Sequence, residues 1–299
     1  MIEAKNAVKY FDKFKAVDSI TATMKEGSVF GLVGSNGAGK STFLRMLTGV
    51  YKCDEGEIFI DGENVWDNVK AKEKCFFVPD DLQFIPNATP EMMCNYFKGI
   101  YLNFDVDRFY RYLNGFSLNK KQKINTFSKG MKRQTAMILA LSSGCEYIIC
   151  DETFDGLDPV ARQTIKSLMI NDIDEKGITP IIASHNLREL EDICDHVGLL
   201  HKGGILFSKD IDDAKMSVHK VQCAFNEEKE KKSFVNLDII KFDKRGSLIT
   251  ITARGSRDDI VRVVEEHRPI FLEVLPLTLE EIFISETEVS GYDLKELFF

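Results

Sequence analysis

Long apolar runs are absent from this sequence of 299 residues. No stretch approaches the roughly 18 consecutive apolar residues that a helix needs to cross a bilayer. The first ten residues, MIEAKNAVKY, also lack the apolar stretch of a secretory signal peptide. We therefore expect the protein to stay in the cytoplasm.

Paired cysteines are lacking as well. The cysteines number seven, which is odd, and no two of them form a CxxC pair. This pattern predicts reduced thiols and argues against a disulfide framework or a zinc site. They are Cys53, Cys75, Cys94, Cys145, Cys150, Cys194 and Cys223.

Basic residues do not outnumber acidic ones in this sequence. The 39 lysines and arginines against 47 aspartates and glutamates give a net charge of -8. That balance argues against nucleic acid or an anionic membrane surface as the main partner. With 44% hydrophobic and 29% charged residues, the composition is that of a globular protein and excludes the disordered, collagen-like and coiled-coil classes.

Apolar runs of strand length alternate with amphipathic segments of helix length along most of the chain. This alternation predicts an α/β body with a mostly parallel sheet. Four such runs are Val29 to Val33, Ile148 to Cys150, Ile181 to Ala183 and Val197 to Leu200.

After about Lys215 the pattern changes. Val221 to Phe225 and Leu248 to Ala253 resemble strands, and Arg257 to His267 resembles an amphipathic helix, which predicts a small α+β appendage.

Aromatic residues are concentrated between Phe84 and Phe116, at helical spacing. Packing of a small core explains such a segment most simply. A groove for a partner helix is the second interpretation.

A strand followed by a glycine-rich loop and a helix start forms a P-loop pattern. Ser28 to Val33 is the apolar strand, and the spacing GxxxxGKS is complete. Glycines let backbone N–H groups converge on phosphate oxygens, and the helix directs the positive end of its dipole at the anion. Lys40 would reach the β- and γ-phosphates, and the Ser41 hydroxyl would ligate Mg²⁺. The predicted phosphate cradle is Gly34, Ser35, Asn36, Gly37, Ala38, Gly39, Lys40, Ser41 and Thr42.

Two adjacent carboxylates, Asp151 and Glu152, end a second apolar strand that begins at Tyr147. We expect this strand to lie directly beside the P-loop strand. Ligands bind at the carboxyl ends of parallel strands. Asp151 could therefore hold Mg²⁺ through water, and Glu152 could polarise the attacking water.

From about Ile2 to Leu206 the sequence resembles the ATP-binding subunit of an ABC transporter. The resemblance implies a P-loop NTPase fold, with an ABC-type ATPase domain over residues 1–214, a helical subdomain at about 82–145 and a C-terminal α+β domain over 215–299. It places the family's signature loop at Phe127 to Gln134, where Lys129 replaces a glycine and Met131 a glutamine. The signature residues implied to contact nucleotide are Ser128, Lys129, Gly130 and Met131.

Four further positions take their roles from the resemblance. Phe154 to Pro159 resembles the family's D-loop. Asp158 occupies its interfacial position, although it is also a plain helix N-cap ahead of Pro159. His185 sits where the family has the histidine that senses the γ-phosphate, although a lone histidine is more often structural. Phe11 would stack on adenine, with the adjacent Tyr10 as the alternative. Asp80 replaces the glutamine of the Q-loop and could still ligate Mg²⁺.

The resemblance implies a catalytic group of Glu152, His185 and Lys40 and a metal group of Ser41, Asp80 and Asp151, with ATP and Mg²⁺ as cofactors. Two nucleotides would lie between the P-loop of one copy and the signature of another, so a homodimer or a pair with a paralogous subunit is implied. A separate membrane permease would be the partner, and no nucleic acid is expected. Pro276 to Ile284 resembles a carboxy-terminal element of ABC-2-type exporters, which favours export.

Three alternatives stay open at the level of sequence. One is a soluble ABC-type ATPase in ribosome regulation or DNA repair, although a second cassette or a long coiled-coil insertion is not visible. Another is a P-loop GTPase or small-molecule kinase, although no Asn-Lys-x-Asp guanine reader is found. The last is an ATP-binding subunit with weak hydrolysis.

Overall fold

The computed structural model describes residues 1–283, apart from the side chains of residues 214, 215 and 217. By backbone contacts the chain divides into two compact units, Met1–Ser208 and Lys209–Phe299. The division falls a few residues before the predicted boundary after residue 214. Among the helices in the described part of the chain, none has both the length and the hydrophobicity of a membrane-spanning segment.

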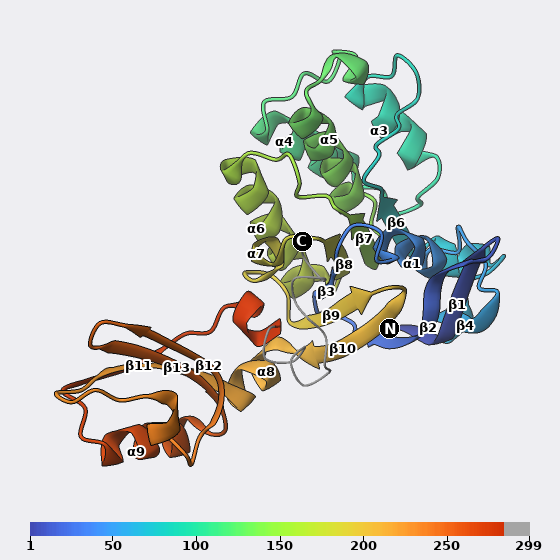
Figure 1. Cartoon of the computed structure of the whole chain (residues 1–299). Helices are drawn as coiled ribbons and strands as arrows, with labels where there is room; N and C mark the ends of the chain where they lie inside the picture. Colours follow the sequence, from blue (N-terminus) through green and yellow to red (C-terminus); the bar gives the residue numbers. More distant parts are fainter. Residues whose placement is uncertain (284–299) are drawn as a thin grey trace. The chain divides into compact units, whose positions relative to one another are not determined.

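The first unit is built on a sheet whose strand order is β10-β9-β3-β8-β7-β6 (Figure 1). The pairs β3–β8, β3–β9, β7–β8 and β6–β7 are all parallel, as the alternation of strands and helices predicts. The strands are β3 (Phe30–Val33), β6 (Cys75–Val78), β7 (Tyr147–Asp151), β8 (Thr179–Ser184), β9 (His196–His201) and β10 (Gly204–Asp210).

One expectation about this sheet is wrong. The strand that ends in Asp151 does not lie beside the P-loop strand, because β8 lies between β3 and β7. The P-loop helix crosses over β8, so its first turn reaches the end of β7: the Ser41 hydroxyl donates to Asp151 Oδ1 at 3.0 Å. Both carboxylates therefore still meet the P-loop at the carboxyl edge of the sheet.

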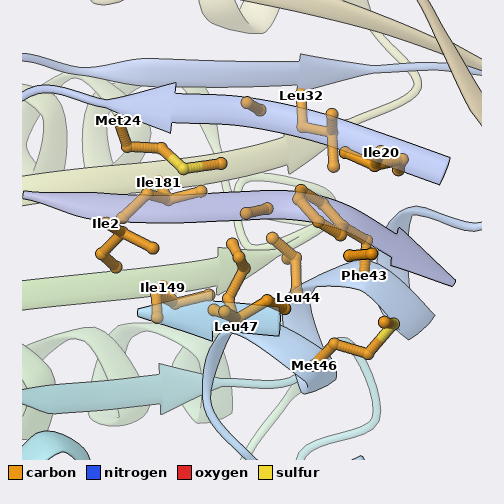
Figure 2. Packing of buried hydrophobic residues seen from close by; sticks show 14 of the residues in the cluster. Ile2, Ile20, Met24, Leu32, Phe43, Leu44, Met46, Leu47, Ile149 and Ile181 are labelled. Carbon is orange, nitrogen blue, oxygen red and sulfur yellow. The ribbon is translucent and has the colours of Figure 1, made fainter. Parts of the chain in front are cut away.

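A second, antiparallel sheet with the order β2-β1-β4-β5 covers the P-loop helix α1 (Lys40–Leu47). Its strands are β1 (Ile2–Phe11), β2 (Phe14–Met24), β4 (Glu55–Ile60) and β5 (Glu63–Asn64). Figure 2 shows Phe43, Leu44 and Leu47 of α1 packed among apolar side chains of both sheets. These side chains are fully buried. Because their packing holds α1 from both sides, the loop at its N-terminus has a fixed place.

A helical segment follows β6, as the spacing between Phe84 and Phe116 predicts. Its helices begin at side-chain caps, with Thr89, Asp105 and Ser128 each accepting a backbone N–H. Phe104 and Phe109 are buried with their rings 6.2 Å apart, so part of the aromatic cluster packs a core. The elements are α3 (Pro90–Lys98), α4 (Val106–Gly115), η1 (Ile124–Thr126) and α5 (Lys129–Ser142).

Three more helices complete the first unit. They are α2 (Val69–Lys72), α6 (Pro159–Lys176) and α7 (Leu187–Leu190). In α6, Asp158 caps the first turn by accepting from the Ala161 N–H at 2.9 Å, and Pro159 is the first helical residue.

The second unit has a sheet of its own with the order β12-β13-β11-β14. Every described pair in it is antiparallel, and α9 packs on it through Ile260 and Val264. The elements are α8 (Ile211–Ser217), β11 (Val218–Ala224), η2 (Lys231–Ser233), β12 (Asp238–Arg245), β13 (Leu248–Arg254), α9 (Arg257–Glu266) and β14 (Phe271–Leu275). Of the exporter-like segment, residues 276–283 are described and Ile284 lies outside the described residues.

Candidate active site

The P-loop connects β3 to α1, and at two of its glycines a side chain would collide with neighbouring backbone. Gly39 has a φ of +105°, and a Cβ there would lie 2.4 Å from the Ala16 carbonyl oxygen. A Cβ on Gly34 would lie 2.4 Å from the Leu200 carbonyl oxygen. Since both contacts are with backbone, they cannot be relieved by a side-chain shift. The glycine spacing therefore reflects close packing of the loop against neighbouring strands.

Lys40 is buried within this loop. Its ammonium donates to the carbonyl oxygens of Gly34 at 2.6 Å and Ser35 at 3.2 Å. The same nitrogen lies 3.2 Å from Glu152 Oε1. The charge of Lys40 is thus held between the loop and the second carboxylate of the Asp-Glu pair, where an anion in the loop would meet it.

Asp151 is completely buried, and only one of its oxygens has a hydrogen-bond partner. Oδ1 accepts from Ser41, while Oδ2 has no hydrogen-bond partner in the described part of the chain. Burial raises the pKa of this carboxyl above its usual value, although the Ser41 hydrogen bond opposes the shift. A buried carboxylate oxygen without a partner, beside a hydroxyl, is a donor set that suits Mg²⁺. The residues present therefore fit that ion.

Glu152 has a left-handed backbone with a φ of +49°, which turns its side chain away from the path of β7. Its carboxylate Oε2 lies 2.8 Å from His185 Nδ1 and 3.3 Å from the His185 backbone N–H. His185 follows β8, the strand that separates β7 from β3. Lys40, Glu152 and His185 consequently form one chain of contacts across the carboxyl edge of the sheet.

A cavity of about 290 Å³ opens at this edge. Six of the predicted P-loop residues line it together with Glu152 and Asp80. Phe11 lies on the same wall and is 42% exposed. Tyr10 is not among the lining residues, whereas Phe14 is. The lining is Phe11, Phe14, Ala16, Asn36, Gly37, Gly39, Lys40, Ser41, Thr42, Asp80 and Glu152.

Asp80 has a partner that the sequence did not indicate. Its Oδ1 accepts from Arg133 Nη2 at 2.6 Å. Arg133 belongs to α5, and its side chain is 1% exposed. No signal in the sequence connects these two positions, because they are far apart in the chain and Arg133 falls on an otherwise basic helix start.

The signature and D-loop residues lie together, but they do not line the cavity. Ser128 accepts from the Met131 N–H at 3.2 Å as the cap of α5. A Cβ on Gly130 would lie 3.1 Å from the Gly156 carbonyl oxygen, so the signature lies close to the D-loop. Lys129 and Asp155 form an ion pair at 2.6 Å between the two segments. The sequence carries no signal for this pairing of Asp155 with Lys129.

Comparisons with known proteins agree with this geometry. The family described as "ABC transporter" matches residues 17–155. The chain is 28% identical to the ABC transporter ATP-binding protein YtrB of Bacillus subtilis, over 96% of this chain and 98% of that protein. It is 34% identical to the linearmycin resistance ATP-binding protein LnrL of Bacillus subtilis and 33% identical to the bacitracin transport ATP-binding protein BcrA of Bacillus licheniformis. Each match covers 69% of this chain and 68% of the relative.

Solved structures show the same fold. An ATP-binding subunit of an ABC transporter is similar with a TM-score of 0.67 and 25% identity, over 72% of this chain and 92% of that one. A dimeric ATP-binding cassette in a post-hydrolysis state, bound to ADP and Pi, is similar with a TM-score of 0.64 and 23% identity, over 71% of this chain and 99% of that one. A complete P-loop, a carboxylate pair at its mouth and relatives matched over two thirds of their length leave one conclusion. The chain belongs to the ABC transporter family, as one of its ATP-binding and ATP-hydrolysing subunits.

Proposed function

We propose that two copies of this chain, or one copy and a paralogue, close around two MgATP and hydrolyse them to drive a separate membrane permease in export. The observation that carries the proposal is the convergence of Lys40, Ser41, Asp151, Glu152 and His185 at one edge of the sheet, around a cavity. Each of these residues has a distinct task in phosphoryl transfer to water.

Binding uses the P-loop and the aromatic wall. The triphosphate lies in the cradle of backbone N–H groups at the N-terminus of α1, where the helix dipole favours negative charge. Lys40 exchanges its bonds to the Gly34 and Ser35 carbonyl oxygens for bonds to the β- and γ-phosphates. Phe11 offers an exposed aromatic face to the base, and stacking on such a face is favourable by about 1–3 kcal/mol.

Ser41 and Asp151 would hold Mg²⁺, which would supply positive charge to neutralise the phosphates. The buried Asp151 carboxylate has one oxygen already fixed by Ser41 and one without a hydrogen-bond partner among the described residues. Whether Asp80 also contacts the ion directly stays a prediction.

Hydrolysis depends on Glu152. Its carboxylate accepts a hydrogen bond from the attacking water and so aims the water oxygen at the γ-phosphorus. The new oxygen–phosphorus bond forms as the bond to the β–γ bridging oxygen breaks, the proton of the water passes to the Glu152 carboxylate, and the negative charge passes to ADP. Lys40 stabilises that charge, and His185 donates to the γ-phosphate oxygens. The Glu152–His185 contact of 2.8 Å keeps both side chains at the same phosphate.

The position of the signature supports the proposed dimer. Ser128 and Gly130 lie at the N-terminus of α5, a helix of 14 residues, but neither lines the cavity of its own chain. A helix N-terminus attracts a phosphate. A second copy can bring its signature to the γ-phosphate from the open side, so that each nucleotide is held between two chains.

For the permease we propose docking at an apolar cleft of about 120 Å³ between the end of β6 and the helical segment. Phe76, Phe84, Met93 and Phe97 are among its lining residues. A helix of the membrane partner would insert apolar side chains there. This is the partner-helix groove considered for the aromatic segment.

Export is supported by the names of the relatives. LnrL is described as a linearmycin resistance protein and BcrA as a bacitracin transport protein. Removal of a toxic compound is one basis of resistance. We extend that direction of transport to this chain.

The dimer is tested with Glu152→Gln, which keeps the shape of the side chain and removes its charge. We expect this variant to elute from a sizing column as a dimer with MgATP and as a smaller species with MgADP or without nucleotide. The reason is that ATP stays intact between the two chains. A Glu152→Gln variant that remains a monomer with bound ATP would contradict the proposed dimer.

The permease is tested by purification from native membranes in detergent. We expect a membrane protein to co-purify with the chain, and Phe84→Asp to lose that protein while its ATP hydrolysis stays normal. The matched control is Val235→Asp in the second unit, where the side chain is 85% exposed and outside the cleft. If the wild-type chain is found only in the soluble fraction with no membrane protein bound, the transporter role fails.

A further inference from the structure

Arg133 is a buried arginine in the first turns of α5. Arginine is almost never fully buried unless its donors are paired, and the Arg133 side chain is 1% exposed. Its Nη1 donates to the Glu152 carbonyl oxygen, and its Nη2 donates to Asp80. Nη2 also lies 3.8 Å from Asp155 Oδ2. The guanidinium therefore joins the residue after β7, the segment after β6 and the D-loop.

The contact with Glu152 is made to its peptide, not to its carboxylate. Glu152 has a φ of +49°, a conformation that side-chain-bearing residues rarely adopt and that surrounding contacts must hold. Its N–H donates to the Ala183 carbonyl oxygen at 2.9 Å. Its carbonyl oxygen accepts from Arg133 and, at 3.3 Å, from the Asp155 N–H. The charge-assisted bond from Arg133 is the stronger of these two.

The second contact fixes the wall of the nucleotide cavity. Asp80 lines that cavity, and its carboxylate would be free to turn if Arg133 did not hold it at 2.6 Å. Asp155 is held from the other side by Lys129 at 2.6 Å. Arg133 itself does not line the cavity, so it acts on the nucleotide only through these neighbours.

We propose that Arg133 is a positioning residue for ATP hydrolysis, which is anchored by Asp80 and holds the Glu152 peptide in its left-handed conformation. The proposal rests on the function assigned to Glu152 above. A general base must stay within hydrogen-bond reach of the water that it orients, and a misplacement of about 1 Å can cost about 100-fold in rate. Turning the Glu152 peptide would displace its carboxylate.

The test measures kcat and KM for MgATP in Arg133→Gln and Arg133→Lys. We expect Arg133→Gln to lower kcat by about 100-fold, since Glu152 is misplaced. KM should change by less than about 3-fold, because the P-loop, Ser41 and Phe11 are untouched. Arg133→Lys keeps the charge but has one ammonium group instead of a planar fork, so it can hold one acceptor and not both. We expect about a 10-fold loss of kcat for this variant.

A double variant separates positioning from simple destabilisation. In single-turnover measurements, Arg133→Gln combined with Glu152→Gln should hydrolyse ATP no more slowly than Glu152→Gln alone, because a residue that acts through Glu152 has nothing left to position. The matched control is Arg108→Gln. Arg108 is also a buried arginine in an ion pair, with Asp172, but it is remote from the cavity lining. The Arg108→Gln substitution should lower the midpoint of thermal unfolding and leave kcat unchanged.

Three results would overturn the proposal. The first is a kcat for Arg133→Gln or Arg133→Lys within about 3-fold of wild type. The second is a loss of rate that multiplies with that of Glu152→Gln. The third is a lowered kcat in Arg108→Gln of the same size as in Arg133→Gln. If Arg133→Gln does not fold, the kcat of Arg133→Lys alone tests the proposal. Failure of the proposed function gives a different pattern: the wild type is inactive, or Glu152→Gln is as active as the wild type.

Discussion

At the scale of single residues, burial of the Asp151 carboxylate in the site has a cost in the stability of the fold. The carboxylate is fully buried, and one of its oxygens lacks a hydrogen-bond partner in the described structure. Burial raises its pKa from the ordinary aspartate value of 3.8. At a pH below 3.8 the carboxyl is protonated in both the folded and the unfolded chain. No charge is then buried, and the free energy of unfolding is not lowered. As the pH rises through the raised pKa of the folded chain, the buried carboxyl ionises. The free-energy cost of burying that charge then reaches its full size.

This cost predicts that Asp151→Asn stabilises the chain when no nucleotide or divalent cation is present. At pH 7 we expect the free energy of unfolding to rise by about 0.5–2 kcal/mol, a common size for single stabilising substitutions. The gain should vanish near pH 4 and below. Urea unfolding at several pH values measures it, and a destabilised Asp151→Asn at pH 7 would contradict it. The same variant should lose MgATP hydrolysis.

The sequence predicts the residues of this site unequally. The P-loop could be predicted because a Cβ on Gly34 or Gly39 would collide with nearby backbone. These two local requirements produce the glycine spacing that is visible in the sequence. Asp151 and Glu152 could be predicted because an apolar strand leads straight to them. The pairing of Asp80 with Arg133 could not, because a contact between segments so far apart leaves no local pattern.

At the scale of elements, the helical segment is joined to the sheet-bearing part of its unit by a buried ion pair. Arg108 of α4 and Asp172 of α6 are each 3% exposed, and the Arg108 guanidinium donates to the carboxylate. A buried charge that loses its partner is strongly destabilising, whereas replacing both partners by apolar side chains can be nearly neutral. The pair thus links α4 to α6.

We predict that Asp172→Leu lowers the free energy of unfolding by about 3–5 kcal/mol, because it leaves the Arg108 charge buried without its partner. Arg108→Met combined with Asp172→Leu should recover most of that loss. Urea unfolding of the two single variants and the double variant measures the coupling. Losses that simply add would show that the two side chains do not depend on each other.

Element order was the least predictable feature of the sheet. Periodicity and length predict β3, β7, β8 and β9 close to their observed bounds. They do not predict that β8 lies between β3 and β7, since neighbours in a parallel sheet are chosen by how the crossover helices pack. The carboxylates still reach the P-loop because α1 spans the intervening strand.

At the scale of the whole molecule, the chain consists of two units with separate hydrophobic cores. The P-loop, the carboxylate pair and His185 all belong to the first unit. We predict that a chain ending at residue 214, which retains all of β10, folds and binds MgATP. Saturating MgATP at about 100 times its dissociation constant should stabilise it by about 2.7 kcal/mol.

Thermal unfolding with and without MgATP measures this stabilisation, with the full-length chain as the reference. An equal shift in both chains would show that the first unit binds nucleotide by itself. A truncated chain that folds but gives no shift would show that binding needs residues after 214.

The central claim is that Glu152 directs water at the γ-phosphate of an ATP held by the P-loop. The most direct measurement is the release of inorganic phosphate from MgATP by the wild type and by Glu152→Gln, with ATP binding measured alongside. We predict that the wild type turns over, and that Glu152→Gln loses about 10²- to 10⁴-fold in rate while it still binds ATP. Equal rates in the two proteins would contradict the account.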